Sequence, residues 1–284
     1  MRAAFFDLDK TVIAKASIAA FGRPFRRGGL ISRRTVARAV VGQLVYLQFG
    51  ASEQKLERIR ESLLLLTKGW ERDRVAEIVR ETLLETIEPI IYREALDLME
   101  RHHEAGDLVY LVSAAPEEIV RPLAYLLWVD GAVASVAEVD GEGRYTGRMA
   151  YYAYGPAKAA AVRRLAEGER IDLAISTAYS DSVTDVPMLE AVGHPVAVNP
   201  DRALARVARE RGWEVREFTN PVRVRDRTAV RTSVLTTALA VATATAALVV
   251  WRGRRSRLAP KVQGRQGRST GRRAPVGAVV RTDL

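Results

Sequence analysis

The sequence predicts an α/β fold in which a doubly wound parallel sheet carries an inserted helical segment. Three observations indicate it. A short hydrophobic strand ends at Asp7 and Asp9, residues 14–88 show only helical periodicity, and short apolar runs alternate with helical stretches after Pro89. Strands that alternate with helices favour a parallel sheet, and ligands of such sheets bind beyond the carboxyl ends of the strands. We therefore expect Asp7 and Asp9 at that edge.

The first strand is the most informative stretch. Residues 5–12 read Phe-Phe-Asp-Leu-Asp-Lys-Thr-Val, and strand alternation sends Asp7 and Asp9 to the same side. Two carboxylates at the mouth of an apolar strand repel each other and lose solvation, which favours a role with a cation or a phosphate. The alternative is a polar turn with an N-capping aspartate.

The segment 14–88 is expected to be helical. Its apolar groups fall at Val36–Phe49, Leu56–Leu66 and Val75–Ile87, separated by Gly50 and Gly69. Its first part is basic, with six arginines and no acid in sixteen residues: Arg23, Arg26, Arg27, Arg33, Arg34 and Arg38. This stretch is either a solvated helix face or a surface that attracts an anionic substrate or lipid headgroups.

The region after Pro89 is expected to alternate between strands and helices. The expected strands are 108–112, 173–178, 196–198 and 213–218, with a hairpin over 132–150. The expected helices start at 116 and cover 158–167, 186–192 and 203–211.

Residues 221–231 read as a linker and are followed by twenty residues without a charge, 232–251. That length matches a membrane span, and Trp251 suits an interface. The composition, rich in Ala and Thr, leaves an interfacial or soluble helix open. The chain begins directly with a strand and shows no secretory signal, which favours a cytoplasmic catalytic domain anchored to the cell membrane by this helix.

The composition limits the chemistry. The net charge is +10, but residues 252–284, a tail expected to be disordered, carry ten Lys/Arg and one acid. The body is nearly neutral, so nucleic acid is not the expected partner, although salt-dependent binding through the tail stays an alternative. The chain has no cysteine, which excludes disulfides, thiolate metal sites and cysteine nucleophiles. Any metal then needs oxygen ligands, which points to Mg²⁺.

Further polar residues follow the later strands. Ser113 ends the strand 108–112, Lys158 follows Gly155-Pro156 near a helix start, and Asp181 and Asp185 lie four residues apart after another strand. A hydroxyl, a fixed positive charge and acids that hold a metal suit a phosphoryl group. Taken singly, Lys158 could be a surface lysine and the others caps. Together with Asp7 and Asp9 they predict a site for a metal ion and a phosphoryl group.

In this order the motifs resemble the haloacid dehalogenase superfamily of hydrolases. Phe-Asp-Leu-Asp-Lys-Thr-Val is similar to its first motif and Ser-Asp-Ser-Val-Thr-Asp-Val-Pro-Met-Leu-Glu to its fourth. The helical insertion resembles the type-one cap of the phosphoserine-phosphatase-like subfamily. The resemblance implies a Rossmann-like hydrolase core at 1–13 and 89–220 and a cap at 14–88.

The resemblance also implies roles. Asp7 is the nucleophile that forms an aspartyl phosphate, and Asp9 is the general acid and base. Mg²⁺ is bound by Asp7, the backbone carbonyl of Asp9 and Asp181, with Asp185 in support. The phosphoryl group is bound by Thr11, Ser113 and Lys158. The expected activity is Mg²⁺-dependent hydrolysis of a small phosphate monoester.

The substrate is less determined. Phosphoserine-specific members carry a glutamate in the early cap, where this chain has Ala16, and no carboxylate occurs between Thr11 and Glu53. They typically place Gly-Gly after the second-motif serine, where this chain has Ala114-Ala115. Strict phosphoserine specificity is therefore not expected. The alternatives are a phosphotransferase of the same fold and a membrane-associated regulator that binds a phosphate ligand without turnover.

Overall fold

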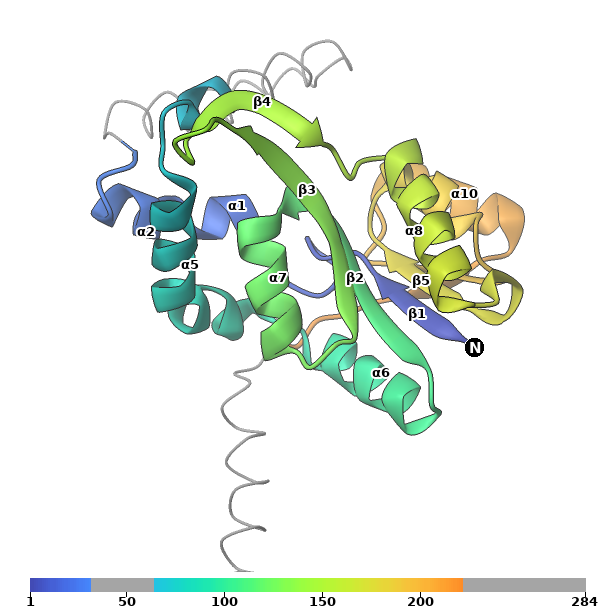
Figure 1. The fold of residues 1–284 in the computed structure, drawn as a ribbon. Coiled ribbons are helices and arrows are strands. Elements are labelled where there is room, and N and C mark those ends of the chain that lie inside the picture. Colours follow the sequence, from blue (N-terminus) through green and yellow to red (C-terminus); the bar gives the residue numbers. More distant parts are fainter. Residues whose placement is uncertain (32–63, 222–284) are drawn as a thin grey trace, which may run out of the picture. The chain divides into compact units, whose positions relative to one another are not determined.

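The computed structural model describes residues 1–31 and 64–221, which belong to one compact unit. Its described part contains a seven-stranded sheet of order β4-β3-β2-β1-β5-β6-β7 (Figure 1). Every neighbouring pair is parallel except the hairpin of β3 and β4. The strands are β1 Ala3–Phe6, β2 Leu108–Pro116, β3 Gly131–Val139, β4 Tyr145–Tyr151, β5 Thr177–Ser180, β6 His194–Val198 and β7 Glu214–Arg216. The predicted parallel α/β fold is confirmed.

Helices cover both faces of the sheet, as Figure 1 shows. The α-helices of the described residues are α1 Ser17–Ala20, α2 Gly22–Arg27, α5 Arg72–Ile87, α6 Arg93–Glu104, α7 Glu117–Leu126, α8 Pro156–Glu169, α9 Val186–Leu189 and α10 Arg202–Arg211. Short 3₁₀ turns occupy Glu88–Ile90, Leu173–Ile175 and Val183–Asp185.

The central strand β1 is buried on both faces because of its alternating side chains. Ala3 and Phe5 join the hydrophobic cluster that α8, α9 and α10 cover. Ala4 and Phe6 join the cluster that includes α5, α6 and α7. A strand packed on both sides explains why β1 is a continuous apolar run, and it fixes the direction in which Asp7 leaves the sheet.

The described part of the helical segment packs directly against the core. Helix α5 contacts α7, and its buried residues share one cluster with those of α7. The chain before α5 also pairs with the hairpin, because Gly69 N–H donates to the Tyr145 carbonyl at 2.8 Å and Tyr145 N–H to the Trp70 carbonyl at 3.0 Å. The expected helices at 36–49 and over most of 56–66 lie outside the described residues, and the boundary between core and cap stays a prediction.

The C-terminal predictions, a linker at 221–231, a membrane helix at 232–251 and a tail at 252–284, likewise fall beyond the described residues, apart from residue 221. Within 1–31 and 64–221, no helix is long and apolar enough to cross a membrane.

Several predicted boundaries were wrong. Leu173–Ile175 is a 3₁₀ turn, and β5 begins only at Thr177. The turn forms because the Asp172 side chain accepts a hydrogen bond from Ala174 N–H, and such local bonds compete with a strand. The helix expected over 186–192 ends at Leu189, and the last strand covers only Glu214–Arg216.

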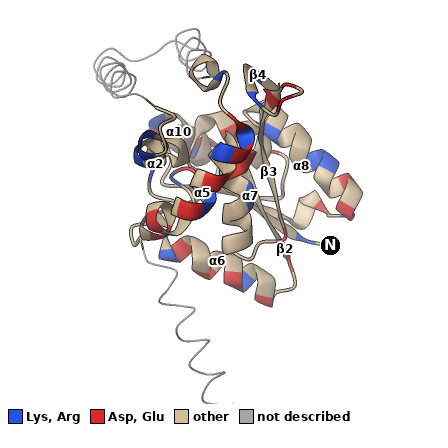
Figure 2. Ribbon diagram, turned by 60° about the vertical axis from the view of Figure 1, so that its left-hand side comes forward, with Lys and Arg blue, Asp and Glu red and all other residues tan. Residues whose placement is uncertain are grey.

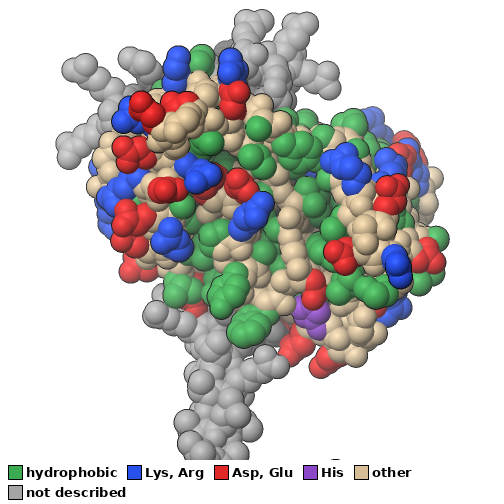
Figure 3. All heavy atoms as spheres, in the orientation of Figure 1, with side chains coloured by type: hydrophobic (Ala, Val, Ile, Leu, Met, Phe, Trp, Pro, Cys, Tyr) green, Lys and Arg blue, Asp and Glu red, His purple; other side chains and the backbone are tan. Residues whose placement is uncertain are grey.

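Many charged side chains of the described residues lie along the outer helices, where acidic and basic residues alternate on α5 and α6 (Figure 2). Figure 3 also shows hydrophobic side chains at the lower end of α7. There Tyr125 and Trp128 are 85% and 80% exposed and their rings stack 6.5 Å apart. Ser113 precedes the opposite end of α7, so this aromatic pair is not part of the predicted site.

A polar network closes the amino end of the sheet. Arg2 Nε donates to Asp107 Oδ1 at 2.6 Å, and His102 Nδ1 lies 2.7 Å from Asp107 Oδ2. His102 Nε2 contacts the Tyr179 hydroxyl at 2.8 Å. Burial raises the pKa of Asp107, but its bonds to Arg2 and His102 outweigh this and lower it overall. Asp107 therefore joins three elements through one ionised carboxylate.

We expect Asp107→Ala to destabilise the protein by about 1–2 kcal/mol at pH 7, because it removes a buried carboxylate that accepts from the partly buried Arg2 and His102 side chains. Because folding lowers the pKa of Asp107, its contribution to stability is fully present at pH values above the ordinary pKa of an aspartate. This contribution should be lost as the pH falls toward 3. Urea unfolding of Asp107→Ala and of the exposed control Asp73→Ala measures the difference. Equal midpoints would contradict the role given to Asp107.

Candidate active site

Asp7 follows β1 directly and lies at the carboxyl edge of the sheet. Its backbone N–H donates to the Tyr179 carbonyl of β5 at 2.9 Å, which sets Asp7 beside the end of that strand. The chain then turns at Lys10, whose φ of 60° is in the left-handed region. Beyond this turn the Ser17 N–H donates to Asp9 Oδ1 at 2.9 Å, so the start of α1 holds the second carboxylate.

Lys158 is the centre of the arrangement. It lies in the first turn of α8 and is 2% exposed. Its Nζ contacts Asp7 Oδ1 at 2.5 Å and Asp185 Oδ2 at 2.7 Å. The helix begins after Gly155, whose positive φ of 52° favours glycine and directs the first turn toward the sheet edge. One buried cation therefore joins two carboxylates that are far apart in the sequence.

The loop after β5 carries Asp181 and Asp185, both buried. Ser180 Oγ donates to Asp185 Oδ2 at 2.7 Å, and Lys10 Nζ lies 3.6 Å from Asp181 Oδ2. Asp201 fixes this loop, because its N–H donates to the Asp181 carbonyl at 2.8 Å and its Oδ2 accepts the Val183 N–H at 3.1 Å. The two aspartates thus have different partners.

Ser113 and Thr11 complete the predicted set, and both are buried. Ser113 lies within β2 rather than after it, at the point where the pairing of β2 with β3 shifts register between Val112 and Pro116. Such an irregularity can redirect a side chain toward a site. Ser113 Oγ accepts the Ala115 N–H at 3.1 Å, while Thr11 Oγ1 has no hydrogen-bond partner among the described residues.

The electrostatics of the site follow from burial. Desolvation raises the pKa of Asp7 to about 7, although Lys158 opposes it. Burial also raises the pKa of Asp181 to about 6 and raises that of Asp9. For Lys158, burial alone would lower the pKa, but Asp7 and Asp185 outweigh it and the pKa rises. The site contains more carboxyl groups than Lys158 alone can neutralise, which favours the binding of a further cation.

The donor set fits Mg²⁺ in its chemistry. Asp7, Asp181 and the Asp9 carbonyl are oxygen donors at one sheet edge, and Mg²⁺ needs only one or two carboxylates when water and a phosphate complete its shell. Within the described residues, however, no three acidic or histidine side chains converge as a preformed metal cage. Lys158 and Ser180 both donate to Asp185 Oδ2, so this oxygen is already engaged by the protein.

Three contributing residues were not singled out from the sequence. Ser17 holds Asp9, Ser180 bonds Asp185, and Asp201 fixes the loop between them. Ser180 precedes Asp181 in the quoted motif and could have been found there. Ser17 acts through its backbone N–H, for which the sequence carries no local signal. Asp201 acts through its side chain as well and is the N-cap of α10, a position that an aspartate before a helix indicates.

Comparisons with known proteins identify the family of the chain. Residues 4–190 match the haloacid dehalogenase-like hydrolase family, and the chain belongs to that family. The chain is 49% identical to an inhibition of morphological differentiation protein of Streptomyces azureus, over 90% of this chain and 94% of the relative. It is 47% identical to a probable phosphatase of Mycobacterium tuberculosis, over 79% and 78%. A phosphoserine phosphatase of the same organism is 37% identical, over 76% and 70%.

Solved structures show the same fold. A Bordetella pertussis protein of unknown function has a TM-score of 0.64 and 32% identity, over 75% of this chain and 97% of that one. A phosphoserine phosphatase with a phospho-aspartyl intermediate analogue has a TM-score of 0.54 at 19% identity, over 76% and 92%. Within the family, the chain is therefore a phosphoserine-phosphatase-like hydrolase of phosphoric monoesters.

We expect Lys158→Met to destabilise the metal-free protein by about 3–5 kcal/mol at pH 8, because it leaves two buried carboxylates without their cation. The cost should shrink at pH 5.5, where Asp7, with a pKa of about 7, is protonated already. Urea unfolding in a chelator at both pH values, with the exposed Lys15→Met as control, measures this. If Lys158→Met lost the same stability at both pH values, the substitution would have disturbed only the packing.

Proposed function

We propose that the protein is a Mg²⁺-dependent phosphatase that hydrolyses a small phosphate monoester through an aspartyl-phosphate intermediate on Asp7. The observation that carries the proposal is the buried contact of Lys158 with Asp7 and Asp185, beside Asp181 at the same sheet edge. A lysine fixed against the nucleophile reduces the repulsion between a carboxylate and a phosphate dianion.

In the first step a carboxylate oxygen of Asp7 attacks phosphorus, and the bond from phosphorus to the ester oxygen breaks. Asp9, whose raised pKa suits a proton donor, gives its proton to the leaving alcohol. In the second step Asp9 takes a proton from water while that water attacks phosphorus, and Asp7 is released. Ser17 keeps Asp9 in one orientation through both steps.

Thr11, Ser113 and Lys158 are proposed to bind the phosphoryl oxygens. Thr11 Oγ1 is buried without a partner in the described residues, as expected of a group that awaits a ligand. Asp7, the carbonyl of Asp9 and Asp181 would hold Mg²⁺, with Asp185 in support. When bound, the ion would neutralise charge on the phosphoryl group.

The site does not specifically favour phosphoserine as the substrate. Ala16, at the position where phosphoserine-specific members carry a glutamate, is exposed, and the neighbouring Ser17 is buried. The similarity to a phosphoserine phosphatase supports a small phosphorylated substrate of related size. A panel of phosphate esters, measured as phosphate release, identifies which one.

We expect Asp7→Asn to reduce phosphate release from an aryl phosphate to background, and Asp9→Asn to reduce it by about 10²- to 10⁴-fold, the usual contribution of a general acid. Wild-type turnover should disappear in a chelator and return with Mg²⁺. The exposed Asp73→Asn is the control. If Asp7→Asn kept wild-type activity, the assignment of the nucleophile would be wrong.

We also propose that residues 14–88 act as a cap over the site and that residues 232–251 attach the protein to the membrane. Cell fractionation of the full chain and of a chain ending at residue 225 tests the second point. The full chain is expected with the membranes and the shorter chain in the soluble fraction. Equal distributions would rule out this anchor.

A further inference from the structure

Lys10 is a charged residue within the site to which the proposed chemistry gives no role. It follows Asp9 in the turn after β1, and its φ of 60° is in the left-handed region, which is unfavourable for a lysine. The turn is held by two hydrogen bonds, because the N–H groups of Val12 and Ile13 both donate to the Leu8 carbonyl, at 2.9 and 3.0 Å. The backbone of Lys10 is thus kept in a costly conformation beside the site, where such conformations often serve a function.

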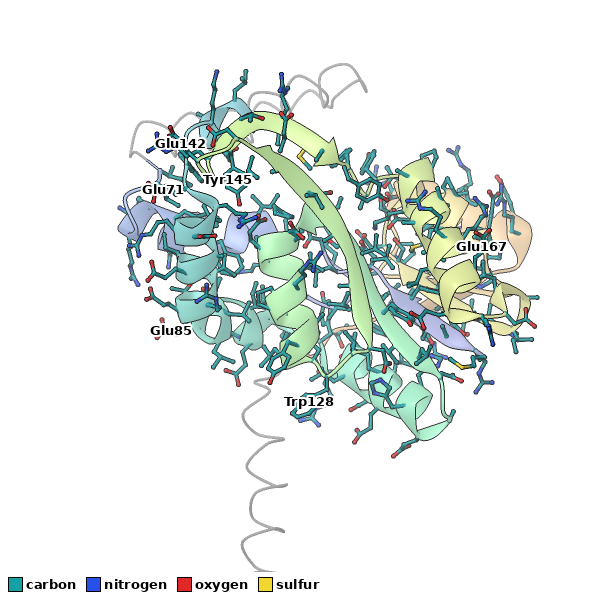
Figure 4. All side chains as sticks on the ribbon, viewed as in Figure 1. Glu71, Glu85, Trp128, Glu142, Tyr145 and Glu167 are labelled. Atoms are coloured by element: carbon teal, nitrogen blue, oxygen red, sulfur yellow. The ribbon has the colours of Figure 1, made fainter. Side chains whose placement is uncertain are left out.

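This turn brings the side chain of Lys10 to Asp181. Its Nζ lies 3.6 Å from Asp181 Oδ2, and the Lys10 side chain is 63% exposed whereas Asp181 is buried. Burial raises the pKa of Asp181 to about 6, and Lys10 is the charge that opposes this rise most. Figure 4 shows the labelled acids Glu85 and Glu167 on the outside of α5 and α8, away from the end of β1 that leads to Lys10. The acid that pairs with Lys10 is one of the proposed metal ligands.

The two lysines of the site are held differently. Lys158 is 2% exposed and contacts Asp7 at 2.5 Å and Asp185 at 2.7 Å, so its departure would leave two buried carboxylates without a cation. Lys10 makes one longer contact from an exposed side chain, and an ion pair with such a partner contributes little to stability. The ammonium group of Lys10 can therefore move into solvent at small cost.

The carboxylate of Asp181 cannot serve Lys10 and a metal ion at the same time. Mg²⁺ binds carboxylate oxygens directly. A doubly charged ion on Asp181 would repel an ammonium group that stayed beside the same carboxylate, most strongly where water is partly excluded. Lys10 and the metal ion therefore compete for Asp181.

Resting on the proposed function, whose metal site includes Asp181, we propose that Lys10 is a displaceable cation that neutralises Asp181 in the metal-free protein and gives way when Mg²⁺ binds. The metal-free site then keeps a cation beside Asp7, Asp181 and Asp185 alike. Part of the binding energy of the metal is used to release Lys10, so this residue sets a lower metal affinity than the acids alone would give.

Titration calorimetry with Mg²⁺ on the substrate-free protein at pH 8, where Asp181 is ionised, tests the competition. Lys10→Met should bind Mg²⁺ about 2- to 5-fold more tightly than the wild type at low salt, the effect of one ion pair with an exposed partner. Added salt should reduce this gain, because it screens the charge of an exposed side chain. Lys10→Arg, which keeps the charge, and the exposed control Lys15→Met should both keep wild-type affinity. Unchanged or weaker binding by Lys10→Met, or an equal gain with Lys15→Met, would overturn the proposal.

The melting temperature provides a second readout, which distinguishes displacement from a purely structural role of Lys10. In a chelator, Lys10→Met should melt below the wild type, because Asp181 has lost its cation. In saturating Mg²⁺ the two proteins should melt at the same temperature, since Lys10 no longer pairs with Asp181 in the wild type. An equal decrease with and without Mg²⁺ would mean that Lys10 only supports the turn, and the proposal would be wrong.

These measurements need neither substrate nor turnover, so they are independent of the proposed function. If Lys10→Met gains Mg²⁺ affinity while no phosphate ester is hydrolysed by the wild type, the displacement stands and the proposed function fails. If the wild type releases phosphate from the aryl ester while Lys10→Met shows no gain, only the displacement is refuted.

Discussion

The contact of Lys158 with Asp7 and Asp185 is the interaction on which the site depends. It joins the end of β1, the first turn of α8 and the loop after β5 through one buried ammonium group. Buried charges of this kind are costly to separate, so the three elements are fixed relative to one another once the trio has formed. The positions of Asp9 and Asp181 follow, because each belongs to a segment that the trio anchors.

The sequence predicted the fold and the members of this trio, because each lies directly after a strand or at a helix start. Such positions can be read from apolar runs and from glycine and proline. It could not predict that Ser113 lies in an irregular part of β2, since register shifts depend on the pairing with β3.

The helical segment and the core are more closely joined than their separation in sequence suggests. The backbone around Gly69 and Trp70 pairs with Tyr145, and α5 and α7 share one hydrophobic cluster. Phe21 and Phe25, which follow Asp9 and Ser17, belong to the same cluster. A change of packing under α5 can therefore reach Asp9 through α1, whose first residue, Ser17, bonds the Asp9 carboxylate.

The dispersal of the trio along the chain has a consequence for synthesis. Asp7 leaves the ribosome first, while Lys158 and Asp185 follow about 150 and 180 residues later. At about 5–20 residues per second, Asp7 is synthesised many seconds before its counter-charge. Throughout that interval the aspartate stays hydrated, because burying it alone is unfavourable. If Asp7 is the nucleophile that we propose, the nascent chain cannot complete its active site before residue 185 has been synthesised and the trio has formed.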